Sequence, residues 1–326
     1  MGHPAAYAAG SPVRWDIRRL TPPVRRKECD LTSQSLRIIL SFDVEEHHRI
    51  EAARGLHIDE RRETHYRERM EYATRWLLDR LGERGVSATF FIVGQIAESH
   101  PDLVRTIARA GHEVASHSWD HRRVHHFTPA TFREDVLRSK DALEQVTGLP
   151  VVGFRAPTFS IVRSTLWALD VLAELGMKYD SSIYPVRHDR YGIPDAPRWP
   201  FLAKGKTHSL LEIPPATWRI LGANLAVGGG GYFRLFPLAL MRRGLAQTMR
   251  QGQPPVAMLY FHPWEFDPDQ ERLPLSRLSH FRTYVGVHRS RHRLTALLDQ
   301  YAFARAVDVA DSLSADMPLA EISLPS

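Results

Sequence analysis

The stretch Leu36-Arg-Ile-Ile-Leu-Ser-Phe42, followed by Asp43-Val-Glu-Glu-His-His48, decides the fold predicted for this chain. Its first part is a nearly continuous apolar run of strand length, as expected for a buried strand. Acidic residues and histidines follow directly. The stretch therefore predicts a buried strand that delivers reactive side chains at its C-terminal end.

The same pattern recurs along the chain, with apolar runs alternating with amphipathic helices. The helices end near Gly82, Gly111, Gly148 and Gly176, because apolar residues recur at spacings of three or four before each glycine. Further strands are expected at 88–93, 113–115, 151–154, 177–179, 210–213 and 256–261. Repeated strand–helix units predict an α/β fold with a parallel sheet, closed as a barrel or open and doubly wound.

Several segments depart from this rhythm. We expect three parts of the chain: a mobile tail at residues 1–34, the main domain at residues 35–315 and a C-terminal tail at residues 316–326. Residues 183–234 are rich in proline and aromatic residues, and predict a long insertion around one strand. The glycine run at 228–231 is expected to form a flexible lid over the site, since no Lys-Ser or Lys-Thr follows it as in a phosphate-binding loop. A polar loop after 265 and a final strand near 306–309 complete the expected fold.

Composition excludes several protein classes. The chain has 326 residues, 43% of them hydrophobic, and its formal charge of +6 is small beside 37 acidic residues, so nucleic acid is not an expected partner. Cys29 is the single cysteine, which excludes an internal disulfide. No apolar run approaches the ~20 residues of a membrane span, and the N-terminus lacks the apolar core of a signal peptide. A cytoplasmic protein is expected.

Two histidines, His117 and His121, follow the strand expected at 113–115. In a helical turn, positions i and i+4 lie on one face about 5–6 Å apart, so both imidazoles could bind one ion. A histidine-rich loop without a ligand is the alternative, because His125 and His126 follow and the chain contains 17 histidines.

Placement at strand ends favours a catalytic site. In a β/α barrel, the active site lies at the C-terminal ends of the strands. Residues that follow predicted strands are Asp43, His117, Arg155, Asp180 and His262. Each alone has a structural explanation, such as a helix cap or a buried histidine, but their shared placement predicts that they meet.

Two neutral imidazoles and a carboxylate leave coordination positions open, as in catalytic metal sites. Asp43 and Glu45 are the candidate carboxylates, and at i and i+2 of an extended chain they point to the same face. One could bind the metal, which lowers the pKa of water toward ~7, while the other acts as a base. His262 on a separate strand is the candidate acid for a departing amine.

Five ordered motifs resemble those of the NodB-homology polysaccharide deacetylases, carbohydrate esterase family 4. They are Phe42-Asp-Val-Glu45, His117-Ser-Trp-Asp-His121, Phe154-Arg-Ala-Pro157, Asp180-Ser-Ser182 and Leu259-Tyr-Phe-His262. The resemblance spans about residues 36–265 and implies a distorted (β/α)7 barrel that removes acetyl groups from N-acetylated oligo- or polysaccharides. Gly228-Gly-Gly-Gly-Tyr-Phe-Arg234 and Pro263-Trp-Glu-Phe266 are most similar to the branch associated with bacterial exopolysaccharide and exosortase loci.

The resemblance implies catalytic roles for four residues. Asp43 is expected to be the general base, which Arg155 orients, and His262 the acid, which Asp180 tunes.

The resemblance also implies one divalent ion, zinc by preference, with cobalt, manganese or nickel as alternatives. His117 and His121 are expected to bind it. The family's usual second aspartate is replaced by Val44, so the carboxylate ligand is expected to be Glu45, with Glu46 as the less favoured alternative.

Substrate contacts are expected from three further residues. Thr158 stands where the family usually has an aromatic residue, and its backbone amide is the candidate oxyanion donor. Trp264 and Tyr232 are the aromatics expected to contact a sugar ring. The other aromatics considered for stacking are Trp199, Trp218 and Phe233, although large aromatics are more often core residues.

Three other functions are compatible with parts of this pattern. Relatives on the same fold open cyclic amides such as allantoin. Two histidines and a carboxylate also form the site of non-haem iron oxygenases, whose antiparallel barrels disagree with the strand–helix rhythm. A non-catalytic binder of polysaccharide or nucleic acid would leave Asp43 and His262 without a role.

Overall fold

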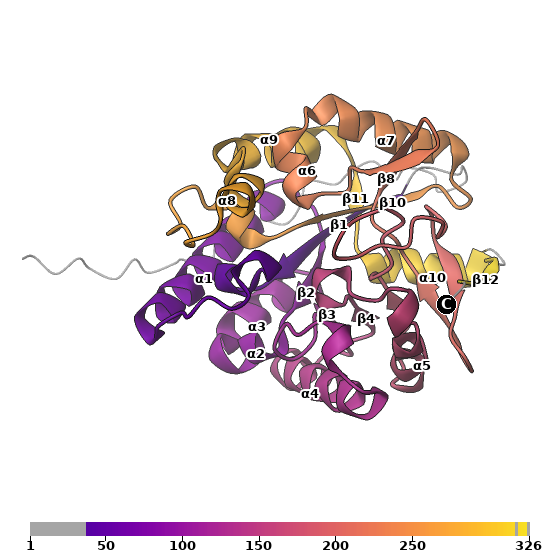
Figure 1. Ribbon diagram of the computed structural model, residues 1–326, viewed down its shortest axis with the longest axis horizontal. Coiled ribbons are helices and arrows are strands. Elements are labelled where there is room, and N and C mark those ends of the chain that lie inside the picture. The colour runs from indigo at the N-terminus through magenta and orange to yellow at the C-terminus, as the bar shows by residue number, and fades with distance from the viewer. Residues whose placement is uncertain (1–36, 317–318, 325–326) are drawn as a thin grey trace, which may run out of the picture. The chain divides into compact units, whose positions relative to one another are not determined.

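The computed structural model describes residues 37–316 and 319–324 (Figure 1). Within these residues, seven parallel strands follow one another in the order β10-β1-β2-β3-β4-β5-β7. Their bounds are β1 Arg37–Val44, β2 Thr89–Ile92, β3 Glu113–Ser116, β4 Gly153–Phe154, β5 Tyr179–Asp180, β7 Ser209–Glu212 and β10 Val256–Phe261. The backbone N–H of Ala216, beyond β7, donates to the carbonyl of Met258 in β10 at 2.9 Å, which closes the barrel. The predicted α/β barrel is confirmed.

Helices cover the outside of these strands (Figure 1). They are α1 Glu60–Gly82, α2 Gly94–Ser99, α3 Pro101–Arg109, α4 Pro129–Thr147, α5 Trp167–Glu174, α7 Leu238–Gln251 and α9 Val287–Gln300. The local sequence of α4 is enough to set both of its ends. The Thr128 side chain accepts from the backbone N–H of Thr131 at the N-terminus, and Gly148 ends the helix with φ 69°. Its buried face is the one that the spacing of apolar residues predicts.

The bottom of the barrel is closed by α10 Ala306–Asp316, which follows the short strand β11 Phe303–Ala304. The strand expected near 306–309 is therefore wrong. Ala306, Val309, Ala310 and Leu313 recur at helical spacing and pack against residues that point into the barrel from β1, β2, β3, β5, β7 and β10. With this end filled by apolar side chains, the C-terminal ends of the strands form the accessible end.

The stretch at 183–234 is more structured than the single strand expected from its composition. It contains β6 Phe201–Lys204, β8 Thr217–Ile220, β9 Ala223–Ala226 and α6 Gly230–Leu235 besides the barrel strand β7. Strand β6 pairs antiparallel with β7, and β12 Glu321–Ser323, from the segment expected to be a tail, pairs with β6. Helix α8 Arg277–Tyr284 replaces the expected polar loop.

The glycine run at 228–231 packs against β10, so the expectation of a flexible lid is wrong. The carbonyl of Gly228 accepts from the backbone N–H of Tyr260 at 2.9 Å. Gly229 has φ 156°, and a Cβ there would lie 1.6 Å from the carbonyl oxygen of Tyr260. Glycine is required because the two backbones approach too closely for any side chain.

Two expectations concern the limits of the chain. The tail predicted at 1–34 and Cys29 lie outside the described residues. Among the helices of the described part, none combines the length and the apolar character needed to cross a bilayer.

Candidate active site

A pocket of about 760 Å³ lies at the C-terminal ends of the barrel strands. Every predicted site residue lines it except Arg155 and Asp180; the lining set includes Asp43, Glu45, His117, His121, Thr158, Tyr232, His262 and Trp264. The strand-end argument therefore placed these residues in one cavity, although they come from segments far apart in the sequence.

Glu45, His117 and His121 form the candidate metal site, because one ligand atom from each lies within 4.8 Å of the others. The Nδ1–H of His117 donates to the carbonyl of Arg155 at 2.7 Å, which leaves the Nε2 lone pair free for a metal. Burial lowers the pKa of His117 to about 4, so its imidazole is neutral. Glu45 Oε2 is buried without a hydrogen-bond partner, although His121 Nε2 lies beside it. These buried donors fit a divalent cation.

His117 and His121 lie close together, but the helical turn that the sequence predicted between them is absent from the structure. The segment after β3 is an irregular loop in which Ser118 and His121 have φ values of 67° and 64°. The Asp135 carboxylate accepts from the Trp119 N–H at 3.0 Å and holds this loop. The His117 and His121 ring centroids are nevertheless 5.1 Å apart. Left-handed backbone at non-glycine residues costs free energy, and it persists here because the neighbouring contacts hold it.

The structure brings Glu45, and not Glu46, to the imidazoles. Glu46 is buried and accepts hydrogen bonds from the guanidinium of Arg49. Burial acts to raise the pKa of Glu46, but the charge of Arg49 lowers it overall. Glu46 is thus occupied by its own cation.

Arg155 lies beneath the pocket and fixes Asp43. Its Nη1 donates to Asp43 Oδ1 at 2.6 Å and to Ser41 Oγ at 3.0 Å, and its Nη2 donates to Ser181 Oγ at 2.9 Å. The guanidinium carbon also lies 4.0 Å from the ring centroid of Phe91. Since Arg155 is fully buried, it orients Asp43 and is screened from substrate.

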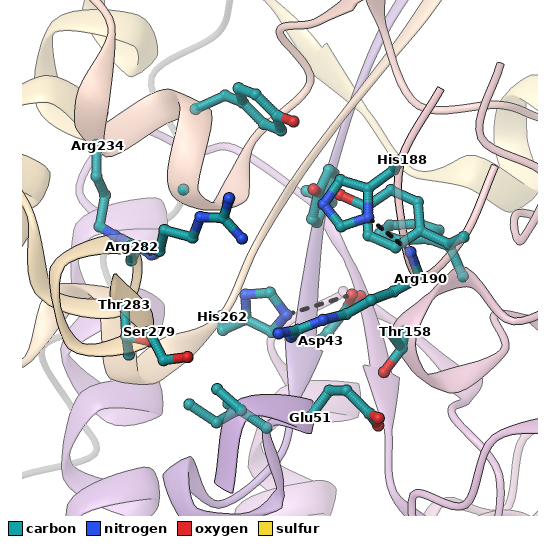
Figure 2. Close-up of a pocket in the computed structure, with 18 of the residues that line it drawn as sticks. Asp43, Glu51, Thr158, His188, Arg190, Arg234, His262, Ser279, Arg282 and Thr283 are labelled. Atoms are coloured by element: carbon teal, nitrogen blue, oxygen red, sulfur yellow. Dashed lines mark hydrogen bonds and ion pairs between the residues drawn. The ribbon is translucent and has the colours of Figure 1, made fainter. Parts of the chain in front are cut away.

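His262 faces Asp43 across the pocket, as Figure 2 shows. Its Nε2 lies 3.9 Å from Asp43 Oδ2 and 3.8 Å from Glu45 Oε1. Its Nδ1 lies 2.7 Å from Glu265 Oε1. Burial alone would lower the pKa of His262, but the hydrogen bond to Glu265 and the charges of Glu45 and Asp43 raise it to about 9. His262 can therefore carry a proton on the nitrogen that faces the pocket.

Glu265 and Arg234 were not predicted as site residues, although they lie in the two segments, 263–266 and 228–234, that resemble the exopolysaccharide branch. The short 3-10 turn Pro263–Phe266 places Glu265 under His262, where Oε1 also accepts from the His262 backbone N–H at 3.0 Å. Its other oxygen accepts from Nη1 of Arg234, and both side chains are buried. The sequence signal that could have identified Glu265 is its position three residues after His262, the candidate general acid.

Asp180 does not contact His262 through any hydrogen bond or ion pair of the described residues. Its Oδ1 accepts from Ser182 Oγ at 2.5 Å, and it interacts with Glu212 on the neighbouring strand β7. Burial raises the pKa of Asp180 to about 6 and that of Glu212 well above its usual range. Glu265 thus occupies the position from which Asp180 was expected to tune His262.

The predicted substrate residues differ in accessibility. Tyr232 is half-buried and lines the pocket, as does Thr158, whose φ is 56°. Trp264 is only 5% exposed, lies nearly parallel to His262 with ring centroids 5.4 Å apart, and forms a wall of the pocket. Phe233 is a core residue and Trp218 packs against the same core; neither these two nor Trp199 lines the pocket.

Comparison with known proteins identifies two matched regions. Residues 66–179 match the polysaccharide deacetylase family, and residues 181–311 match a domain of unknown function, DUF3473. His117, His121 and Arg155 lie in the first region, whereas Glu265 and His262 lie in the second. The pocket is therefore built from both.

Curated relatives match over parts of their length. A peptidoglycan-N-acetylglucosamine deacetylase of Bacillus cereus is 30% identical over 95 residues, which are 29% of this chain and 34% of that protein. A chitooligosaccharide deacetylase of Rhizobium leguminosarum bv. trifolii is 33% identical over 102 residues, which are 31% of this chain and 45% of that protein. The matches thus span less than half of each relative.

Two solved structures share the fold. A Mycobacterium smegmatis protein assigned as a polysaccharide deacetylase has a TM-score of 0.54 and 21% identity, over 86% of this chain and 92% of that one. Puue allantoinase has a TM-score of 0.56 and 18% identity, over 86% and 91%. These likenesses show the fold, a distorted (β/α)7 barrel, and the part of the chain that matches the polysaccharide deacetylase family is residues 66–179.

Proposed function

We propose that the protein is a metal-dependent deacetylase that hydrolyses N-acetyl groups of amino sugars in a bacterial exopolysaccharide or its precursor. One observation carries the proposal: the Glu45–His117–His121 set, Asp43 and His262 face the same pocket. The relatives named as N-acetylglucosamine and chitooligosaccharide deacetylases support the reaction. The sequence resemblance at 228–234 and 263–266 supports the exopolysaccharide.

Glu45, His117 and His121 would hold the ion, and zinc suits two imidazoles and a carboxylate. When bound, such an ion lowers the pKa of water and polarises a carbonyl. The protein keeps His117 neutral by burial and fixes its tautomer through the carbonyl of Arg155. Arg49 keeps Glu46 away from the site, so a single carboxylate reaches the imidazoles.

Asp43 and His262 would move the protons of the reaction. Asp43 Oδ1 is held by Arg155, so its Oδ2, on the side of His262, is the atom that can accept a proton from the attacking water. The hydrogen bond from Nδ1 to Glu265 and the charges of Glu45 and Asp43 raise the pKa of His262 to about 9, so His262 carries a second proton on Nε2 that it can give to the departing amine. Since base and acid are separate groups 3.9 Å apart, neither must change role within one turnover.

The test is acetate release from N-acetylated oligosaccharides. After chelation, addition of zinc, cobalt, manganese or nickel in separate reactions identifies the ion that restores turnover. We expect His262→Ala to keep the metal but lose acetate release, and His117→Ala to lose both. His125→Ala is the matched control, because His125 does not line the pocket.

Two other outcomes would contradict the proposal. Normal turnover by His117→Ala or His262→Ala would refute the assigned roles. Oligosaccharide binding without hydrolysis in any metal would indicate a non-catalytic binder.

A further inference from the structure

We infer that the pocket recognises an amino sugar that carries or adjoins an anionic group, a carboxylate or a phosphate, and that Arg190 and Arg282 bind this group. The inference rests on the proposed function and narrows its substrate. Its basis is the balance of charge in the pocket, where the acids are compensated but several arginines are not.

The pocket contains four carboxylates besides the buried Glu265 beneath it, and each has a cationic or imidazole neighbour. Asp43 pairs with Arg155, and Glu45 belongs to the metal site. Glu51 lies 3.3 Å from Arg123 and 3.8 Å from Arg54. The cationic neighbour of Asp189 is Nε of Arg190 at 4.0 Å. Nδ1 of His188 also lies 3.0 Å from Asp189, but it accepts the Arg190 backbone N–H and burial lowers the pKa of His188, so it adds no positive charge. The acidic residues therefore leave little unpaired negative charge to attract a cation.

The arginines of the pocket are balanced less completely. Arg234 is paired with Glu265. Arg187 and Arg282 line the pocket, and their guanidinium groups have no ion pair or hydrogen bond with the described residues. Within the described part of the chain, the guanidinium group of Arg190 has one ionic partner, Asp189, at 4.0 Å. The pocket thus has an excess of positive charge at its open side.

Arg190 and Arg282 approach the pocket from opposite sides. Figure 2 shows the two side chains directed inward toward His262, and in this view the Arg190 side chain passes over Asp43. Arg190 comes from the loop before β6, and Arg282 from α8. A substrate group near the acetamide could therefore meet two guanidinium groups, which bind carboxylate and phosphate oxygens with paired donors.

The backbone at both arginines is anchored. The carbonyl of Arg190 accepts from Arg123 Nη2 at 2.8 Å, and its N–H donates to His188 Nδ1 at 3.2 Å. The carbonyl of Arg282 accepts from Arg234 Nη2 at 3.2 Å. A held backbone reduces the ordering cost of binding, so the charges are positioned before the substrate arrives.

The loop of Arg190 also supplies an aromatic face. The His188 ring lies 3.9 Å from the Tyr191 ring at an interplanar angle of 10°, and Tyr191 is parallel to the buried Tyr184. His188, Arg190 and Tyr191 all line the pocket. A ring wall beside a guanidinium group suits a sugar that has one apolar face and one anionic substituent.

The experiment compares substrates that differ in charge. Acetate release is measured with a neutral N-acetylglucosamine tetrasaccharide and with a tetrasaccharide alternating N-acetylglucosamine and glucuronic acid. N-acetylglucosamine 1-phosphate against N-acetylglucosamine forms the phosphate arm. We expect a higher kcat/KM for at least one anionic substrate, and the arm that shows it identifies carboxylate or phosphate. Equal kcat/KM for charged and neutral substrates in both arms would overturn the inference.

Variants assign the preference to the arginines. Arg190→Ala/Arg282→Ala should reduce the ratio of anionic to neutral kcat/KM at least ~10-fold, the size expected for losing charge-assisted hydrogen bonds. Arg282→Lys should retain part of it. Arg242→Ala/Arg243→Ala removes the same two charges from exposed positions of α7 outside the pocket and should leave the ratio unchanged. A double variant that folds and keeps the full ratio would contradict the assignment.

Equilibrium binding of the same oligosaccharides, measured by calorimetry with metal removed, separates this inference from the proposed function. Tighter binding of an anionic oligosaccharide that is lost in the double variant, without acetate release by the metal-loaded protein, would refute the deacetylase and keep the anion site. Acetate release with equal binding of charged and neutral sugars would refute the anion site alone.

Discussion

Glu265→Gln tests how the protein holds the proton of its candidate general acid. Glu265 is the hydrogen-bond partner of His262 Nδ1 at 2.7 Å, and the pKa of His262 is raised to about 9. A hydrogen bond between charged groups contributes about 1.5–3 kcal/mol, and 1.36 kcal/mol corresponds to one pKa unit. Removing the charge of Glu265 should therefore lower the pKa of His262 by roughly 1–2 units, to about 7–8.

The sign of the effect follows from the role of His262. A general acid acts while protonated, so activity falls as pH rises through its pKa. The alkaline limb of the kcat profile should move to lower pH in Glu265→Gln. Both proteins must carry the same metal, because a nearby cation also lowers the pKa of His262. An unchanged alkaline limb in a folded variant would refute the argument.

The substitution also affects folding, and the controls must separate the two effects. Glu265 accepts hydrogen bonds from His262 and from Arg234, so a glutamine amide must place its N–H groups against a donor. A lost or opposed buried hydrogen bond costs about 1–3 kcal/mol. The double variant Glu265→Gln/Arg234→Met removes the opposed donor and should regain part of the Tm while keeping the shifted profile. Glu212→Gln is the matched control for the pH profile of kcat, because Glu212 is an equally buried acid outside the pocket.

Three further predictions concern the metal, the glycine run and the buried acids. His117→Ala should lower bound metal from near stoichiometric to trace levels by elemental mass spectrometry, with Tm measured as a fold control; full retention would contradict the ligand assignment. Gly229→Ala should lower the free energy of unfolding by about 2–5 kcal/mol, because its Cβ would overlap a carbonyl of β10 and the backbone would be strained. The control Gly222→Ala should cost about 1 kcal/mol, since a Cβ there meets nothing within 4 Å. Equal unfolding midpoints for the two variants would contradict this. Because the folded pKa of Glu212 lies above its unfolded value, wild-type stability should fall as pH rises above ~4, by up to ~1.4 kcal/mol per unit. Glu212→Gln supplies a permanent N–H toward Asp180 and should gain Tm relative to wild type between pH 5 and 8. A pH-independent difference in Tm would refute the raised pKa of Glu212 as its cause.

The sequence predicted the barrel because its long strands are buried on both faces. β10 is a continuous apolar run of six residues, and β1 is apolar at Ile38–Leu40 and Phe42 and buried over seven of its eight residues, so few alternatives to a buried strand remain. The segment at 306–313 could not be assigned in the same way, since a short apolar run fits a strand or a helix equally well. Its helical form depends on the barrel interior that it fills, and that interior exists only after the strands have assembled.

The candidate site was predicted through placement more than through local geometry. His117 and His121 meet although no helical turn joins them, because contacts from α2 and α4 hold the loop. The glycine run was interpreted by composition as mobile, but it is required by close packing against β10. Local patterns identify which residues approach the site, whereas the conformation that presents them is set by tertiary contacts.

The hydrogen-bond partner of His262 is Glu265, and not Asp180, which the sequence resemblance had assigned to tuning it. Asp180 stands in its expected motif, yet its carboxyl shares a buried environment with Glu212, while Glu265 reaches Nδ1 of His262 from the next turn of the chain. Arg234 joins Glu265 to the backbone carbonyl of Arg282 on α8. A group bound by Arg282 would therefore act on a segment that also holds the partner of the general acid. If this link is used, Arg282→Ala should change kcat as well as KM for an anionic substrate, whereas a purely electrostatic contact would change KM alone.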